Sequence, residues 1–118
     1  MDYNQKLYVV SRRDLRPGAQ AVQAMHAIRE FVHKFPEQDK QWYQQSNHLC
    51  FLSVENELEL VALMHQANAK GIHWAAFQEP DFEMEYTAVC LEPTYSSKEL
   101  CFGMPTALSE YAAGPRRQ

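Results

Sequence analysis

The chain lacks the features of a membrane or secreted protein. No apolar run approaches the roughly 20 residues that a membrane-spanning helix needs. The N-terminal residues 1–5 also lack the basic and apolar segments of a signal sequence. We therefore expect a soluble, cytoplasmic protein.

Cysteine is scarce, and its spacing excludes two further classes. Cys50, Cys90 and Cys101 are odd in number and show no Cys-x-x-Cys pattern, which argues against a disulfide framework and a zinc knuckle. Cys50 and Cys90 lie in apolar, strand-like runs, so we interpret them as small buried hydrophobic residues.

Motifs for nucleotides, nucleophilic serines and metals are missing as well. The sequence has no Gly-x-Gly-x-x-Gly, no P-loop and no Gly-x-Ser-x-Gly. His26 and His33 are seven residues apart, whereas paired metal ligands on one helix usually stand three or four apart. We expect no metal and no cofactor.

Positive charge is limited and local. The formal net charge is −4, which argues against a surface built wholly for nucleic acid. The first quarter of the chain is nevertheless basic and one later segment is acidic, through Lys6, Arg12, Arg13, Arg16 and Arg29 and through Glu79, Asp81, Glu83 and Glu85 respectively. The basic patch could hold the phosphates of a nucleic acid such as tRNA, and the sequence leaves a homodimer open.

The pattern of the 118 residues is that of one α/β domain, residues 1–118, with a frayed tail from about residue 112. Strand composition covers residues 6–11, 48–54, 72–77 and 86–91, and helical patterns lie at 19–34, 37–45, 57–70 and 97–102. This order predicts a sheet covered on both faces by helices. If the first and third strands are parallel, the basic turn and the acidic loop emerge at the same edge of the sheet.

Helix boundaries are also marked in the sequence. Asn56 and Glu59 resemble a capping box, and Gly71 fits the C-terminal end of the helix that follows. In the first helix the apolar stripe is Ala21, Ala24, Met25, Ile28, Phe31 and Val32. This stripe predicts that Gln23, His26 and Glu30 occupy the opposite, polar side.

Several short motifs in a fixed order carry a family resemblance. They are Arg13-Asp14-Leu15 after the first strand, Gln23-x-x-His26-Ala27 in the first helix, Gln78-Glu79 after the third strand, and residues 87–93 as the fourth. In this the chain resembles the type 2 peptidyl-tRNA hydrolases. The resemblance implies a three-layer α/β/α sandwich with a four-stranded mixed sheet, and hydrolysis of the ester between a peptide and the tRNA 3′ ribose without metal or organic cofactor.

The resemblance also implies a set of site residues. The family uses a His in the first helix and a Thr on or near the fourth strand, which His26 and Thr87 match. It has an Asp after the third strand, where Glu79 stands here and Asp81 is a second candidate. The departure is Ala19, which occupies the approximate place of the family's Lys.

Arginine is the nearest substitute for that missing amine. Arg16 is the closest cation, and Arg binds phosphate well but does not readily exchange a proton. We therefore assign phosphate binding to Arg12, Arg13 and Arg16, and positioning of the substrate to Gln23. Thr87 and the first-helix N-terminus at residues 18–20 could donate hydrogen bonds to a developing oxyanion.

Each candidate also has a purely structural interpretation. His26 fits a surface histidine, Thr87 a strand former, and the alternating acids a solvated loop. The three turn arginines fit an ion-pair network that neutralises the acids across the sheet edge. Two functions follow: a peptidyl-tRNA hydrolase-like esterase, or a non-catalytic module that docks a protein or small ligand in the same crevice.

Overall fold

The computed structural model describes residues 5–109. The elements in chain order are β1 (Leu7–Arg12), α1 (Pro17–Lys34), α2 (Pro36–Gln45), β2 (Leu49–Val54), α3 (Glu57–Ala69), β3 (Trp74–Glu79), the 3-10 helix η1 (Pro80–Phe82), β4 (Glu85–Leu91) and α4 (Tyr95–Leu100). Among these described residues, no helix combines the length and the apolar character of a membrane span.

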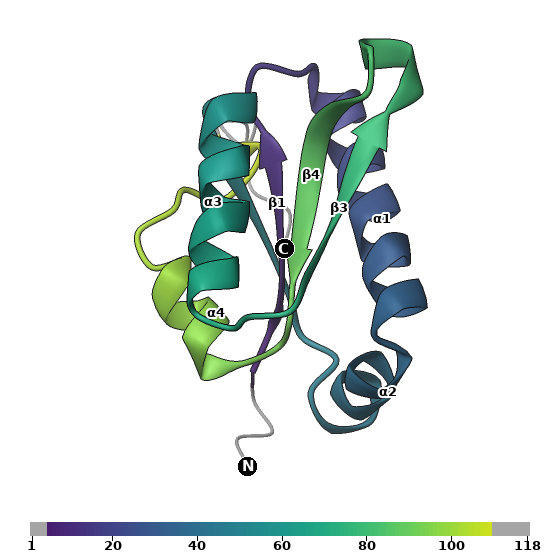
Figure 1. Ribbon diagram of the computed structural model, residues 1–118, viewed down its shortest axis with the longest axis vertical. Helices are drawn as coiled ribbons and strands as arrows, with labels where there is room; N and C mark the ends of the chain where they lie inside the picture. The colour runs from purple at the N-terminus through teal and green to yellow at the C-terminus, as the bar shows by residue number, and fades with distance from the viewer. Residues whose placement is uncertain (1–4, 110–118) are drawn as a thin grey trace, which may run out of the picture.

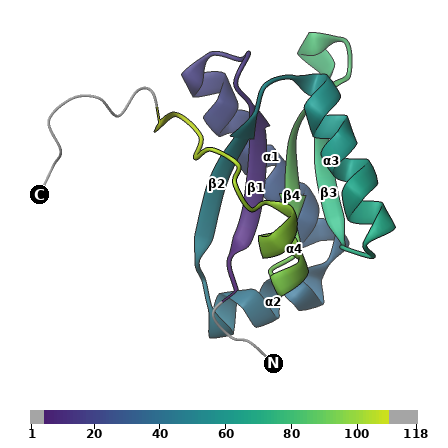
Figure 2. The same ribbon diagram turned by 90° about the vertical axis from the view of Figure 1, so that its left-hand side faces the viewer.

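The four strands form one mixed sheet between two helical layers. The strand order is β2, β1, β4, β3, with β1 parallel to β2 and β4 antiparallel to both β1 and β3, as Figure 2 shows from left to right. Figure 1 shows α1 and α2 on one side of the sheet and α3 and α4 on the other. The predicted α/β sandwich with a four-stranded mixed sheet is confirmed.

The strand directions decide where a site can be built. Because β1 and β3 are both antiparallel to β4, they run in the same direction, and their carboxyl ends lie at one end of the sheet. The turn after β1 and the loop after β3 therefore emerge together, as expected. The first turn of α1 begins at this same end (Figure 1).

Alternating residues of the central strands fill two separate cores. Leu7 and Val9 of β1 pack toward α1 together with Phe31, whereas Tyr8 and Val10 pack on the opposite face. The α3 core also contains Leu60, Leu63, Met64, Ala67, Val89, Leu91 and Cys101. A strand buried on both faces has no polar alternation, which is why the first strand was recognisable as central.

The predicted start of α3 is present in a shifted form. Asn56 Oδ1 accepts a hydrogen bond from the Glu59 N–H at 3.1 Å, as an N-cap does. The Glu59 carboxylate accepts the N–H of Glu55, at 2.6 Å, rather than that of Asn56. The helix ends before Gly71, whose φ of 70° is the left-handed conformation that glycine tolerates.

The prediction of which side of α1 is buried and which is exposed is wrong by about one residue. Gln23 is 3% exposed and Met25 is 57% exposed, so the glutamine lies on the buried side and the methionine on the surface. The buried residues are Gln20, Gln23, Ala24, Ala27 and Phe31. An apolar stripe misplaces the helix because the Gln23 amide has partners for both its oxygen and its nitrogen inside the protein, which lowers the cost of burying it. Gln20 is satisfied in part, since its Nε2 donates to the Leu15 carbonyl and its buried Oε1 has no partner among the described residues.

Smaller differences concern the ends of elements and the cysteines. The helix expected at 97–102 is α4, which begins earlier because Thr94 caps it by accepting the Ser97 N–H. Cys90 and Cys101 are buried, and burial raises the pKa of Cys101 to about 12, but Cys50 is only partly buried. The tail predicted to fray from about residue 112 lies outside the described residues.

Candidate active site

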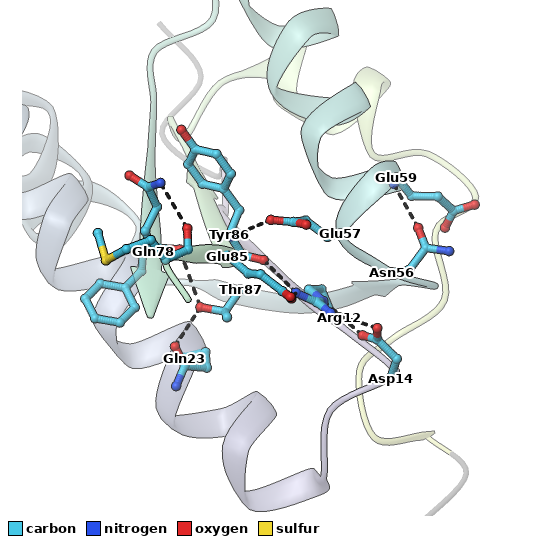
Figure 3. Close-up of polar contacts among 12 residues, drawn as sticks. Arg12, Asp14, Gln23, Asn56, Glu57, Glu59, Gln78, Glu85, Tyr86 and Thr87 are labelled. Carbon is cyan, nitrogen blue, oxygen red and sulfur yellow. Dashed lines mark hydrogen bonds and ion pairs between the residues drawn. The ribbon is translucent and has the colours of Figure 1, made fainter. Parts of the chain in front are cut away.

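A buried polar chain connects α1 to β3 and β4 at the open end of the sheet. Thr87 Oγ1 donates to Gln23 Oε1 at 2.6 Å (Figure 3). Gln23 Nε2 in turn donates to Glu79 Oε1 at 3.0 Å. Thr87 and Gln23 are both buried, whereas Glu79 is partly exposed. The two bonds fix the orientation of the Gln23 amide, because its oxygen must face the hydroxyl and its nitrogen the carboxylate.

A bulge in β4 turns Thr87 toward α1. Phe77 pairs with Ala88 and Gln78 pairs with Tyr86, so Thr87 has no partner in the register between β3 and β4. Tyr86 packs against the α3 core and Ala88 belongs to the α1 core, yet the Thr87 hydroxyl reaches Gln23 on α1. An extra residue in a strand re-aims the side chains around it. Strict alternation would have directed Thr87 to the opposite face.

His26 lies one helical turn after Gln23 and is exposed to solvent. Its ring stacks on Phe77 of β3, with a centroid distance of 4.2 Å and an angle of 9° between the planes. Within residues 5–109, the ring nitrogens make no hydrogen bond to another residue. One face of the imidazole is therefore held by the protein, while its nitrogens remain accessible to a ligand.

The loop after β3 anchors Glu79 but leaves Asp81 exposed. Glu79 Oε2 accepts the Asp81 N–H at 3.4 Å, and the Glu79 carbonyl accepts the Met84 N–H at 3.0 Å. Glu83 and Met84 have positive φ angles of 55° and 64°, which close the loop tightly. Asp81 lines a pocket of about 360 Å³ together with Leu15, Phe82, Glu83 and Glu85.

Arg12 belongs to an ion-pair network. Its guanidinium donates to both carboxylate oxygens of Asp14, at 3.0 and 2.8 Å, to Glu85 at 2.6 Å and to the Tyr86 carbonyl at 3.1 Å (Figure 3). The pair lowers the pKa of Asp14 and raises that of Arg12. Four of the five guanidinium N–H donors are thereby used. For Arg12 this matches the interpretation that the turn arginines form an ion-pair network with nearby acids.

The other two arginines of the turn diverge. Arg13 pairs with Glu55 at 3.0 Å and lines a groove of about 610 Å³ on the α3 side, with Phe102 and Met104 among its walls. Arg16 is the N-cap residue of α1, is exposed, and forms no ion pair within the described part of the chain. Of the three turn arginines, Arg16 therefore remains available at the His26 end.

The start of α1 is open. Gln20 N–H donates to the Arg16 carbonyl at 2.9 Å, which leaves the N–H groups of Gly18 and Ala19 without a partner in the helix ladder. Pro17 has no N–H. A Cβ added to Gly18 would meet no atom within 4 Å, so a ligand can approach this turn.

The structure thus joins some of the predicted site residues and separates others. Gln23, Glu79 and Thr87 are hydrogen-bonded, and His26 adjoins them through Phe77. Asp81 lies on the adjoining loop, Arg16 marks the start of the same helix, and Arg12 and Arg13 are engaged with carboxylates. In the described residues, no group of three His, Cys, Asp or Glu side chains could hold a metal ion.

The prediction from sequence missed Phe77 and the bulge. Phe77 was assigned to an apolar strand, and nothing in a single strand sequence distinguishes a core aromatic from one that supports a neighbouring ring. The bulge depends on the pairing of β3 with β4 and is invisible before that register is known. Writing the β3 and β4 sequences side by side, with Thr87 opposite the boundary between Phe77 and Gln78, is the comparison that could have revealed the bulge.

Comparison with known proteins gives the family of the chain. The family described as peptidyl-tRNA hydrolase PTH2 matches residues 5–99. No curated protein matches the sequence significantly. The matched segment runs from the start of β1 into α4 and includes every predicted site residue. The chain therefore belongs to the peptidyl-tRNA hydrolase PTH2 family.

Proposed function

We propose that the protein is a hydrolase that cleaves the ester between a peptide, or an N-blocked amino acid, and the 3′ ribose of tRNA. The observation that carries this proposal is the exposed His26 imidazole beside the Gln23, Glu79 and Thr87 chain, next to the open first turn of α1. Membership of the PTH2 family supports the same class of reaction.

Proton transfer is assigned to His26 and a carboxylate. His26 takes a proton from the attacking water as the water oxygen bonds to the ester carbonyl carbon, and the proton then passes to the leaving ribose oxygen as the ester bond breaks. Glu79 is favoured over Asp81 as the supporting carboxylate, because Gln23 and the loop backbone hold it in place. Asp81 is the alternative, since it is exposed on the adjoining loop.

The remaining groups bind or position the substrate. Thr87 is fully buried and acts through Gln23, so both are positioning residues in this mechanism. The N–H groups of Gly18 and Ala19 are suited to the developing oxyanion, since they lie at the positive end of α1. Arg16 is suited to a phosphate of the tRNA, because its guanidinium is exposed at the same turn.

The residue at position 19 favours a second function, that of a non-catalytic docking module. Ala19 stands where the family presents an amine, so the chain lacks one cation at the start of α1. A non-catalytic module that docks a protein or small ligand at the same end of the sheet would not need that amine. The hydrolase is preferred here because a docking surface gives no reason for an exposed histidine to be stacked on Phe77 beside the hydrogen-bonded Gln23, Glu79 and Thr87.

One assay separates the two functions. The pure protein is incubated with peptidyl-tRNA or N-acetyl-aminoacyl-tRNA, with and without EDTA, and hydrolysis of the ester bond is followed over time. We expect turnover that EDTA does not change and that His26→Ala removes. Absence of turnover by the folded wild-type protein would favour the docking module, and loss of turnover in EDTA would require a metal that the proposal does not include.

A further inference from the structure

We infer that Phe77 is a positioning residue for the hydrolysis, because its ring fixes the plane of the His26 imidazole beside the reacting ester. The inference rests on the proposed function, in which His26 moves the proton. Phe77 touches neither the water nor the ester in this role. It acts through the ring that it supports.

The need for such support follows from the exposure of His26. A histidine that works as an acid or base is usually oriented by a hydrogen bond from its second ring nitrogen to a carboxylate or carbonyl. Across residues 5–109 His26 has no such bond, and the stack on Phe77 is the ring contact that holds it. An exposed side chain without a contact exchanges among rotamers, so its nitrogens would seldom point at the ester.

The Phe77 ring itself rests on a rigid base. Its backbone is paired with Ala88 in the sheet, and its carbonyl accepts a second, longer contact from Thr87 Oγ1 at 3.4 Å. Phe77 alternates with Ala75, which belongs to the α1 core, so its ring stands on the α1 side of β3. The same residue therefore meets His26 through its ring and Thr87 through its backbone.

The nearly parallel geometry matters for the chemistry. With 9° between the planes, Phe77 covers a face of the imidazole and leaves the ring edge, where both nitrogens lie, uncovered. A perpendicular contact could instead have blocked an edge. Misplacement of a reacting group by about 1 Å can cost about 100-fold in rate, so the loss of this platform should be measurable.

The test compares Phe77→Leu with Phe77→Tyr in the full chain. We expect kcat to fall between about 10-fold and 100-fold in the leucine variant, with KM for peptidyl-tRNA nearly unchanged, because the ring orients a group and does not bind the substrate. The tyrosine variant keeps the aromatic face and should restore most of kcat. NMR of the His26 ring protons should show an upfield ring-current shift in the wild type and the tyrosine variant that is absent in the leucine variant.

A matched control is Phe35→Leu. Phe35 stacks on His73 at 4.7 Å and 6° at the other end of the sheet, so its removal disturbs an equivalent pair without touching the site. Its kcat should stay at the wild-type value. Thermal melts of all variants identify any that fold poorly, and the tyrosine variant then carries the kinetic comparison.

The outcomes separate this inference from the proposed function. A folded Phe77→Leu protein with wild-type kcat, alongside an inactive His26→Ala, would overturn the positioning role and leave the hydrolase proposal standing. Equal losses of kcat in the leucine and tyrosine variants would also overturn it, because the aromatic face would then be irrelevant. A fully active His26→Ala would overturn both.

Discussion

Two histidines at opposite ends of the sheet are surrounded by the same residue types but are bonded differently. The His26 cluster consists of Gln23, His26, Phe77, Glu79 and Thr87. The His73 cluster consists of Phe35, Gln38, His73, Glu92 and Thr94. Each has a histidine stacked on a phenylalanine, with a glutamine, a glutamate and a threonine nearby.

The His73 cluster is closed upon itself. His73 Nδ1 lies 2.9 Å from Gln38 Oε1 and 3.5 Å from Glu92 Oε1. The largely buried Glu92 also accepts the His73 N–H at 2.9 Å, Gln38 Nε2 at 3.3 Å and Thr94 Oγ1 at 3.0 Å. The cluster thereby connects α2 to the start of β3 and the end of β4, which is a structural task.

The two clusters differ in whether the imidazole nitrogens are already bonded to the protein. In the His26 cluster the Gln23 amide bonds to both the Thr87 hydroxyl and the Glu79 carboxylate, and the described residues leave the imidazole nitrogens unbonded. In the His73 cluster, Gln38 bonds to the ring nitrogen Nδ1, and Glu92 accepts the His73 backbone N–H and lies 3.5 Å from the same ring nitrogen. Residue types alone therefore do not identify a site, whereas the polar groups that remain open to a ligand do.

The strongest test of this contrast is removal of each histidine. His26→Ala should lower kcat by about 100-fold or more with little change in thermal stability, because the exposed ring fills no core space. His73→Ala should keep kcat and lose about 1 kcal/mol of unfolding free energy, because its bonds to Gln38 and the Phe35 stack disappear. Steady-state kinetics and thermal melts measure both.

Three results would break the contrast. Wild-type turnover in a folded His26→Ala protein would exclude His26 from the chemistry. An unfolded His26→Ala protein would make the two clusters equally structural. Loss of kcat in His73→Ala without loss of stability would place a catalytic role at the wrong end of the sheet.

The glutamines give the next largest difference. Gln23→Leu fills the same buried space but removes the donor to Glu79 and the acceptor of Thr87, so kcat should fall about 10-fold and stability by about 1 to 3 kcal/mol. Gln38→Leu, in the half-buried counterpart, should leave kcat unchanged. Urea unfolding and kinetics on both proteins check this, and an unchanged kcat in Gln23→Leu would remove the buried chain from the mechanism.

The sequence predicted the strands and helices that carry both clusters better than the hydrogen bonds within the clusters. The succession of strands and helices along the chain and the caps at Asn56 and Gly71 follow from local patterns, which depend on neighbours a few residues away. The shared end of β1 and β3 was expected only on the condition that the two strands are parallel, which the sheet pairing supplies. The burial of Gln23 did not follow from local patterns, because its partners Glu79 and Thr87 lie 56 and 64 residues further along the chain. Hydrogen bonds of that separation are invisible to a pattern that scores only apolar periodicity.

The charged residues near the site show the same limit. The basic turn was recognisable, but whether each arginine serves a ligand or a carboxylate depends on the tertiary pairing. Arg12 meets Glu85 across 73 positions of sequence, and Arg13 meets Glu55 across 42. Only Arg16 keeps the exposure that its predicted phosphate role requires.

Binding of tRNA should therefore depend on the charge at the His26 end. Arg16→Ala should weaken tRNA binding a few-fold and reduce the salt dependence of the association constant by about one counterion. Lys40→Ala changes an exposed cation on α2, at the His73 end, and should change neither quantity. Titrations at several ionic strengths provide the measurement, and equal binding by Arg16→Ala and wild type at every salt concentration would remove Arg16 from the proposed site.

The smallest expected effect concerns acid stability at the His26 end, where Arg12 lowers the pKa of Asp14. A carboxyl whose pKa is lower in the folded than in the unfolded state stabilises the fold above its ordinary value of about 4, and this contribution is lost as the pH falls through the folded pKa. Asp14 is 42% exposed, so solvent screening keeps the contribution below about 1 kcal/mol.

Asp14→Asn should be less stable than wild type at pH 7, and the difference in unfolding free energy should narrow as the pH falls from about 4 to 2. Urea unfolding at each pH measures the gap. A gap that stays constant with pH would mean that the Asp14 pair stabilises the turn through its geometry and not through its charge.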